Sequence, residues 1–252
     1  MNGLRVAIGR FRTAALGVWL GLANPFTPAV AQSERLVDLE LILAVDVSSS
    51  VDAAEFDLQM QGLAAAFRDP AVLAAIRATG GRGIAVSLIQ WSAGGDQTIA
   101  VDWTAVRDRA SADLFADRLA RTPRLILGGD TSIKGAIRYA ARQFENNGFA
   151  GLRQVIDISG DGGAIVTLET AMPDKARDGA VAQGITINGL AILDEVPHLQ
   201  AYYRDYVIGG AGAFVMVASD YQDFAAAMLE KLVREISDRP VASLPSPGAE
   251  QP

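Results

Sequence analysis

Three short stretches of this chain gather the residue types that could carry chemistry at a common edge of a fold. They read Asp46-Val47-Ser48-Ser49-Ser50, Gly128-Gly129-Asp130-Thr131-Ser132 and Ser159-Gly160-Asp161-Gly162-Gly163. All three carry short side chains that end in oxygen, and none carries a histidine or a cysteine. Carboxylates and hydroxyls are hard ligands that suit Mg²⁺, Ca²⁺ or Mn²⁺ better than zinc or copper.

The spacing within the first stretch favours a shared direction for its polar side chains. In an extended segment, residues i, i+2 and i+4 point to the same side, so Asp46, Ser48 and Ser50 could converge on one cation. Neutral hydroxyls with few carboxylates leave a divalent ion short of negative charge, and such an ion accepts a further anionic oxygen from a partner. Taken alone, the stretch is more typical of a turn that caps a helix than of a metal site.

The elements that would position these loops alternate along the chain. Apolar runs predict strands at 39–45, 83–92, 98–103, 154–159, 185–193 and 213–218. Helical patterns lie at 52–67, 111–121, 131–144, 173–183, 197–206 and 221–236. The alternation predicts an α/β fold, a doubly wound and mostly parallel six-stranded sheet with helices on both faces. A short hairpin before 98–103 makes that strand an antiparallel edge. Ligands of such sheets bind beyond the carboxyl ends of the strands.

The order of the motifs carries a family resemblance. "DVSSS", "GGDTSIKGAI" and "SGDG", on this alternating pattern, resemble a von Willebrand factor type A (VWA) domain over about residues 38–237. The segments "ARDGAVAQGITINGLAI" and "VSLIQWS" further resemble an uncharacterised exported bacterial branch of that superfamily. The resemblance implies a Rossmann-like sheet and a metal-ion-dependent adhesion site (MIDAS), in which a bound cation recognises an acidic residue of another protein.

The resemblance also assigns residues to that site. It implies Mg²⁺, or Mn²⁺ or Ca²⁺, held partly through water, by Asp46, Ser48, Ser50, Thr131 and Asp161. Asp130 and Ser159 are candidates for supporting positions around these ligands, and either Asp130 or Thr131 is expected to cap the helix that follows. The partner is an unknown protein that supplies Asp or Glu.

Two departures from the family pattern stand in the fourth predicted strand and the loop after it. The family's third loop usually reads T-D-G, whereas Gly160 precedes Asp161 here, so a turn one residue longer is expected. Asp157 lies inside the strand, where a carboxylate is costly to bury alone. We expect a neighbouring loop or an arginine to be its structural partner.

Enzyme readings find less support. An aspartyl-nucleophile phosphatase would need a carboxylate where Ser48 stands, and neither a G-x-S-x-G nor a dinucleotide-binding glycine motif is present. Lys134 lacks the preceding glycine of a phosphate-binding loop, and His198 is the single histidine. We therefore predict no catalytic residues. Two alternatives remain: a Mg²⁺-dependent hydrolase that uses the same site, and a periplasmic scaffold whose site is vestigial.

Composition and the chain ends add the setting. A net charge of −7 and a pI near 4.8 speak against nucleic acid as a partner, and the absence of cysteine excludes disulfides and thiolate metal sites. Residues 1–31 carry the basic start, the short apolar core and the small residues of a signal peptide cleaved after Ala31. We expect a periplasmic or secreted domain at 38–237 with no membrane span, followed by a disordered, proline-rich tail at 238–252.

Overall fold

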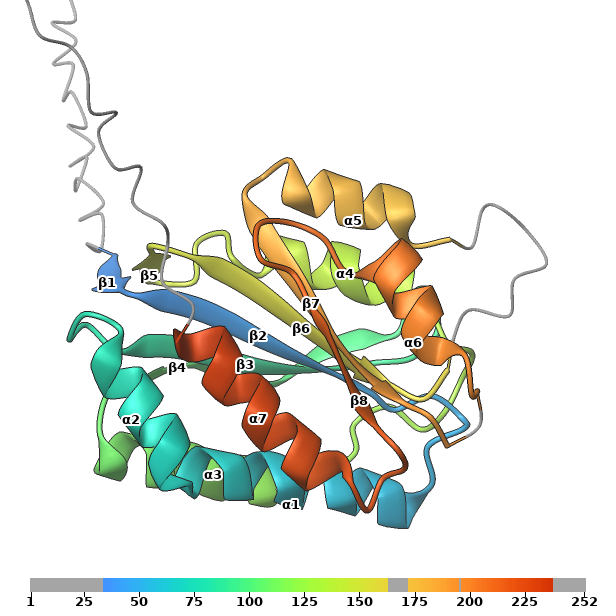
Figure 1. Ribbon diagram of the computed structural model, residues 1–252, viewed down its shortest axis with the longest axis horizontal. Helices are drawn as coiled ribbons and strands as arrows, with labels where there is room; N and C mark the ends of the chain where they lie inside the picture. Colours follow the sequence, from blue (N-terminus) through green and yellow to red (C-terminus); the bar gives the residue numbers. More distant parts are fainter. Residues whose placement is uncertain (1–33, 163–171, 195, 238–252) are drawn as a thin grey trace, which may run out of the picture. The chain divides into compact units, whose positions relative to one another are not determined.

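The computed structural model describes residues 34–162, 172–194 and 196–237, and these residues build a six-stranded sheet with helices on both faces (Figure 1). The strands follow the order β4-β3-β2-β6-β7-β8. Their bounds are β2 (Leu39–Asp46), β3 (Ile84–Trp91), β4 (Gln97–Val106), β6 (Gln154–Gly160), β7 (Ile185–Ile192) and β8 (Val215–Ala218). Neighbouring strands are parallel except β3 and β4, which are antiparallel. The predicted fold class and antiparallel edge strand are therefore confirmed.

The helices divide between the two faces of the sheet. One face is covered by α1 (Ala53–Arg68), α2 (Pro70–Ala78), α3 (Arg109–Ala120) and α7 (Phe224–Ser237). The other is covered by α4 (Ile133–Arg142), α5 (Asp174–Val181) and α6 (Leu199–Tyr202). β2 is buried along its whole length, with Leu41 and Leu43 in the first core and Ile42 and Ala44 in the second. A continuous apolar strand is what two covered faces require.

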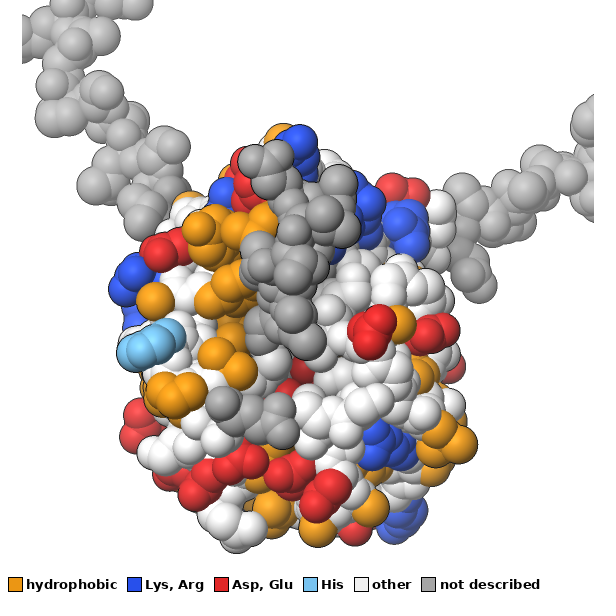
Figure 2. All heavy atoms as spheres, turned by 90° about the vertical axis from the view of Figure 1, so that its right-hand side faces the viewer, with side chains coloured by type: hydrophobic (Ala, Val, Ile, Leu, Met, Phe, Trp, Pro, Cys, Tyr) orange, Lys and Arg blue, Asp and Glu red, His pale blue; other side chains and the backbone are white. Residues whose placement is uncertain are grey.

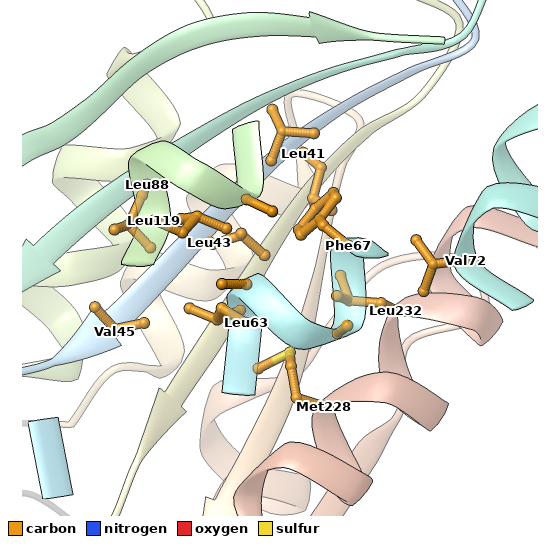
Figure 3. Close-up of a cluster of buried hydrophobic side chains, with 14 of the residues drawn as sticks. Leu41, Leu43, Val45, Leu63, Phe67, Val72, Leu88, Leu119, Met228 and Leu232 are labelled. Carbon is orange, nitrogen blue, oxygen red and sulfur yellow. The ribbon is translucent and has the colours of Figure 1, made fainter. Parts of the chain in front are cut away.

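The core between β2, α1 and α7 packs along β2 as far as Val45. Figure 3 shows Leu43 of β2 near Leu63 and Phe67 of α1, with Met228 and Leu232 of α7 closing the cluster. Burying each such side chain contributes about 1.5–3 kcal/mol. The strand is therefore firmly held up to its last residues, and the loop that leaves it starts from a fixed point.

The first helix begins where the sequence predicts. Asp52 accepts a hydrogen bond from the Glu55 amide at 2.9 Å, and Glu55 accepts one from the Asp52 amide at 2.7 Å. This capping box satisfies two amides at the start of α1. Only residues 47–52 therefore connect the end of β2 to the helix.

The structure also contains elements that the sequence patterns do not reveal. A short strand β1 (Arg35–Val37) pairs in parallel with β5 (Phe149–Gly151) as a separate two-stranded sheet. Helix α2 follows α1 after a single residue, Asp69, which caps it, and Pro70 occupies its first position. The helix expected at 197–206 is instead the short α6 followed by a π-helical turn, η2 (Tyr203–Val207).

The predicted leader at 1–31 and the predicted tail at 238–252 lie outside the described residues, and both stay predictions. Within the described residues the first strand, β1, begins at Arg35, three residues before the expected domain start at residue 38. Among the helices of the described residues, none has the length and apolarity that crossing a membrane requires.

Candidate metal centre

Asp46 is the last residue of β2, and its carboxylate lies in the interior at the carboxyl end of the sheet. The side chain has no exposed surface, and its Oδ1 accepts a hydrogen bond from the Ser48 amide at 2.8 Å. Its carbonyl oxygen accepts a hydrogen bond from Nε2 of Gln59 on α1 at 3.0 Å. One carboxylate is thus fixed in place directly beneath the loop that follows.

The side chains of that loop alternate as the spacing predicts. The hydroxyls of Ser48 and Ser50 lie 3.2 Å apart. Val47 and Val51 are buried in the core instead. The hydroxyl of Ser49 points away from this pair and bonds the Gly129 backbone, donating to its carbonyl at 3.0 Å and accepting from its amide at 2.9 Å.

Thr131 and Asp161 complete a connected group of oxygens, which we call the oxygen cluster: the side chains of Asp46, Ser48, Ser50, Thr131 and Asp161. The Thr131 hydroxyl lies 3.2 Å from the Ser48 hydroxyl, and the Ser50 hydroxyl donates to Asp161 Oδ1 at 2.8 Å. Three loops far apart in the sequence therefore meet at one point. The structure brings together all five residues that the sequence predicts as ligands.

Gly160 explains how the Asp161 loop comes so close to Asp46. A Cβ atom at position 160 would lie 2.7 Å from Asp46 Oδ2 and 3.1 Å from the Tyr203 hydroxyl, so no larger residue fits without movement. The expected longer turn does not occur. Gly160 is still a strand residue, paired with Ala191, and Asp161 follows it directly.

Burial dominates the electrostatics of the cluster. Burial, and secondarily the charge of Asp161, raise the pKa of Asp46 to about 7, against the opposing hydrogen bonds from Ser48 and the charge of Arg124. Oδ2 of Asp46 and Oδ2 of Asp161 are both buried without a hydrogen-bond partner. Buried carboxylate oxygens are normally satisfied, so these two oxygens are open to a further partner.

Two tyrosines lie beside the carboxylates, and the sequence did not predict them as parts of the site. Tyr203 of η2 and Tyr221 are buried, and neither hydroxyl has a hydrogen-bond partner. Burial raises the pKa of both phenols, and the charges of Asp46 and Asp161 raise them further. The sequence places both residues more than forty positions from any metal motif, and only the fold brings them to the carboxylates.

The two residues expected to support the ligands, Asp130 and Ser159, lie in different surroundings. Asp130 is exposed on the loop before Thr131. Ser159 is buried in β6, where its hydroxyl donates to the Ala44 carbonyl at 3.4 Å. The expectation that Asp130 or Thr131 caps α4 is wrong, because Ser132 is the N-cap and accepts from the Gly135 amide at 3.2 Å. This leaves the Thr131 hydroxyl free to face the cluster.

The cluster differs from a carboxylate-rich metal site. Across the described ranges, no group of three or more His, Cys, Asp or Glu side chains is placed to hold a metal ion. The cluster offers two carboxylates and three hydroxyls, a set of hard oxygen donors.

Figure 2 shows the end of the molecule toward which β2 runs, with acidic side chains gathered along its lower part. Burial raises the pKa of Glu55, and the charges of Asp52, Asp194 and Asp161 raise it further.

Comparison with known sequences identifies a family. The model of a family described as "Protein of unknown function (DUF1194)" matches residues 36–240, and the chain belongs to this family. No curated protein gives a significant match to the sequence.

Comparison with solved structures identifies the fold as VWA-like. Proximal thread matrix protein 1 (PTMP1) from the mussel byssus superposes with a TM-score of 0.61 at 13% identity, covering 81% of this chain and 49% of that one. The vWF domain of the type V pili tip protein Mfa5 from Porphyromonas gingivalis superposes with a TM-score of 0.54 at 11% identity, covering 79% and 95%. The chain thus spans about half the length of the mussel protein.

A further structure of the mussel protein bears on the metal. It is described as having a zinc-occupied MIDAS motif, and it superposes with a TM-score of 0.56 at 13% identity, covering 81% of this chain and 49% of that one. At this identity the comparison establishes the shared fold. The resemblance to the VWA fold stated from the sequence motifs is confirmed.

Proposed function

We propose that this member of the DUF1194 family is an exported, non-catalytic protein-binding domain that works through a divalent cation. The cation would be held by the oxygen cluster and would recognise an Asp or Glu carboxylate of a partner protein. The observation that carries the proposal is the convergence of the five oxygen-bearing side chains around two orphaned carboxylate oxygens. A bound cation would satisfy both oxygens at once.

The charge balance of the cluster supports a ligand from outside. Two carboxylates can neutralise a divalent ion only when both are ionised, and burial works against ionisation of Asp46. The remaining donors, the hydroxyls of Ser48, Ser50 and Thr131, are neutral. A cation held mainly through hydroxyls keeps affinity for one more anionic oxygen, and a carboxylate of another protein is the simplest source.

The donor set supports a hard divalent ion. The cluster offers carboxylate and hydroxyl oxygens, which are the ligands that Mg²⁺, Mn²⁺ and Ca²⁺ prefer. We therefore propose Mg²⁺, with Mn²⁺ or Ca²⁺ as alternatives.

The surroundings of the cluster favour binding over catalysis. Hydrolysis at the metal would need a general base beside it, and His198 is exposed on the segment after β7. The groups that flank the carboxylates are the phenols of Tyr203 and Tyr221, whose raised pKa values make them poor bases at neutral pH. Two of the proteins with similar structures are a thread matrix protein and a pilus tip protein, which fits a role in binding.

Calorimetry with Mg²⁺ on the full chain tests the proposal. Wild type should bind Mg²⁺, and Asp46→Ala combined with Ser48→Ala should abolish binding, because one carboxylate and one hydroxyl are lost. Asp57→Ala is the matched control, since Asp57 is an exposed carboxylate on α1. Unchanged Mg²⁺ binding in the double variant would overturn the proposal.

The alternatives give different outcomes in partner experiments. A metal-dependent binder should lose its partner when EDTA is added and regain it with excess Mg²⁺. A scaffold with a vestigial site should retain the same partner in EDTA. A hydrolase should turn over members of a phosphoester panel and lose that turnover on Asp161→Ala.

A further inference from the structure

Both terminal nitrogens of the Arg124 guanidinium bond the backbone of the loop that carries three of the proposed ligands. It lies half-buried between α3 and α4. Its Nη2 donates to the carbonyl oxygens of Val47 at 2.8 Å and Ser48 at 2.9 Å, and its Nη1 donates to that of Val51 at 2.8 Å. Its Nε donates to the Ile126 carbonyl in its own loop at 3.1 Å.

These bonds fix the peptide planes between the proposed ligands. The Val47 and Ser48 carbonyls lie between Asp46 and Ser50 in the chain, in a segment that belongs to neither strand nor helix. Without Arg124, these partly buried carbonyls would lose charge-assisted hydrogen bonds that are each about twice as strong as neutral ones. A planar guanidinium loses less freedom per bond than a lysine would, so it suits this bridging position.

Gln90 of β3 forms hydrogen bonds with the backbone of the residues before and after Arg124. Its side chain has no exposed surface, its Nε2 donates to the Pro123 carbonyl at 2.8 Å, and its Oε1 accepts from the Leu125 amide at 2.7 Å. The two bonds therefore fix the backbone on both sides of residue 124. Hydrogen bonds thus connect the buried strand β3, through Gln90 and Arg124, to the loop after Asp46.

The same two loops are joined a second time near the cluster. The Ser49 amide donates to the Gly129 carbonyl at 3.0 Å, in addition to the two bonds of the Ser49 hydroxyl. Gly129 adopts φ +117°, a conformation that L residues with side chains rarely reach, so this contact depends on glycine. Because Thr131 follows two residues later, holding the two loops together also sets the distance between Thr131 and Ser48.

We propose that Arg124 is a positioning residue that keeps the loop after Asp46 in its metal-binding form before the cation arrives. The inference rests on the proposed function, since it concerns the same site. It deepens that function by making the site preformed, so that Mg²⁺ binds without the partner protein.

The test compares Arg124→Lys and Arg124→Met with wild type by Mg²⁺ calorimetry on the full chain without a partner. Both variants should bind Mg²⁺ at least about tenfold more weakly, because the fork that reaches three carbonyls is lost in both. Arg121→Met is the matched control: Arg121 precedes Arg124 by three residues, its side chain is 79% exposed, and it pairs with Asp117 instead. Wild-type affinity in Arg124→Lys would overturn the inference, because charge alone would then suffice.

Hydrogen exchange without metal separates this inference from the proposed function. In both Arg124 variants the amides of Ser48, Ser49 and Val51 should exchange faster, while amides in β2 and β7 keep their protection and show that the fold is intact. Unchanged loop protection would overturn the inference. Faster loop exchange together with no Mg²⁺ binding by wild type would remove the proposed function and leave the positioning role standing.

A double-mutant cycle tests the path through Gln90. Gln90→Leu keeps the approximate volume and removes both backbone bonds, so Mg²⁺ affinity should fall in the same direction as in Arg124→Met. If Gln90 acts by placing Arg124, the double variant should bind no more weakly than Arg124→Met alone. Additive losses would show that Gln90 does not work through Arg124.

Discussion

Asp157 of β6 and Lys231 of α7 form an ion pair in the interior, with 2.6 Å between Oδ1 and Nζ and at most 1% of either side chain exposed. The same ammonium lies 2.5 Å from Oε1 of Glu235, one helical turn further along α7. Glu235 also accepts a hydrogen bond from Nδ2 of Asn188 at 2.9 Å. The partner of Asp157 is therefore a lysine, so the prediction of an arginine or a neighbouring loop as its partner is wrong.

The pairing leaves two buried carboxylates sharing one cation. Burial, with the charge of Glu235 second, raises the pKa of Asp157 to about 7, although Lys231 opposes the shift. Lys231 of α7 thus supplies the polar partner of Asp157 that a neighbouring loop was expected to supply. The sequence offers no signal for the pairing, because 74 positions separate the two residues and Lys231 follows an ordinary helical pattern.

The first prediction concerns stability against pH. The ordinary pKa of 3.8 is raised to about 7 in the folded state, so the folded protein holds the proton of Asp157 more tightly than the unfolded chain does. The resulting stabilisation is fully present below about pH 4 and is lost as pH rises to about 7. Urea unfolding of the metal-free protein at pH 5 and pH 8 measures it.

The Asp157→Asn variant isolates this contribution, because Asp46 titrates in the same direction. Asparagine mimics the protonated carboxyl and leaves Lys231 with one carboxylate partner. We expect the variant to be more stable than wild type at pH 8 and close to it at pH 5, so its dependence on pH should be flatter. An unaltered pH dependence would show that Asp157 is ionised in the folded protein throughout.

The second prediction concerns the cation of the same group. Lys231→Met removes the only ammonium from two fully buried carboxylates and should cost about 3–5 kcal/mol of unfolding free energy at pH 8. The loss should shrink at pH 5, where the carboxyls take up protons. Lys175→Met, at an exposed position on α5, is the control and should change stability by less than about 0.5 kcal/mol. Equal losses in the two variants would contradict the interpretation.

The sequence predicted the sheet and the oxygen cluster because both depend on local patterns. The mainly apolar run at 39–45 is typical of a strand covered on two faces, and the alternation of Asp46, Ser48 and Ser50 follows from an extended backbone. The parallel sheet then brings the ends of β2 and β6 together. The contacts around the cluster were not predictable. Arg124 bonds the loop after Asp46, and Tyr203 lies beside the carboxylates, but the sequence patterns of their segments do not indicate these neighbours.

The short elements of the fold were not predictable from the sequence for a related reason. β1 and β5 each have three residues, too few for an alternating pattern to show, and they exist through pairing with each other. The break between α6 and η2 is set by tertiary packing, since Tyr203 and Val207 are both fully buried against the sheet. Local propensity in 197–206 gave no indication of it.

The third prediction concerns Gly160. Gly160→Ala would place a methyl group 2.7 Å from Asp46 Oδ2, so the carboxylate must move away from the other oxygens. Mg²⁺ affinity by calorimetry should fall about tenfold or more, and thermal stability should fall as well. Gly179→Ala is the matched control, because nothing lies within 4 Å of its Cβ position, and it should stabilise α5 by up to about 1 kcal/mol. Full affinity in Gly160→Ala would show that Asp46 Oδ2 is not needed.

The fourth prediction separates the hydroxyl of Thr131 from its methyl group. The hydroxyl lies 3.2 Å from Ser48 Oγ, and a Cβ atom at position 162 would lie 3.2 Å from this hydroxyl and 3.3 Å from the Thr131 methyl carbon. If the oxygen is a ligand, Thr131→Ser should bind Mg²⁺ within about threefold of wild type. Thr131→Val keeps the shape, removes the oxygen, and should lose at least about tenfold. Calorimetry on the two variants decides the matter, and equal affinities would mean that Thr131 contributes packing alone.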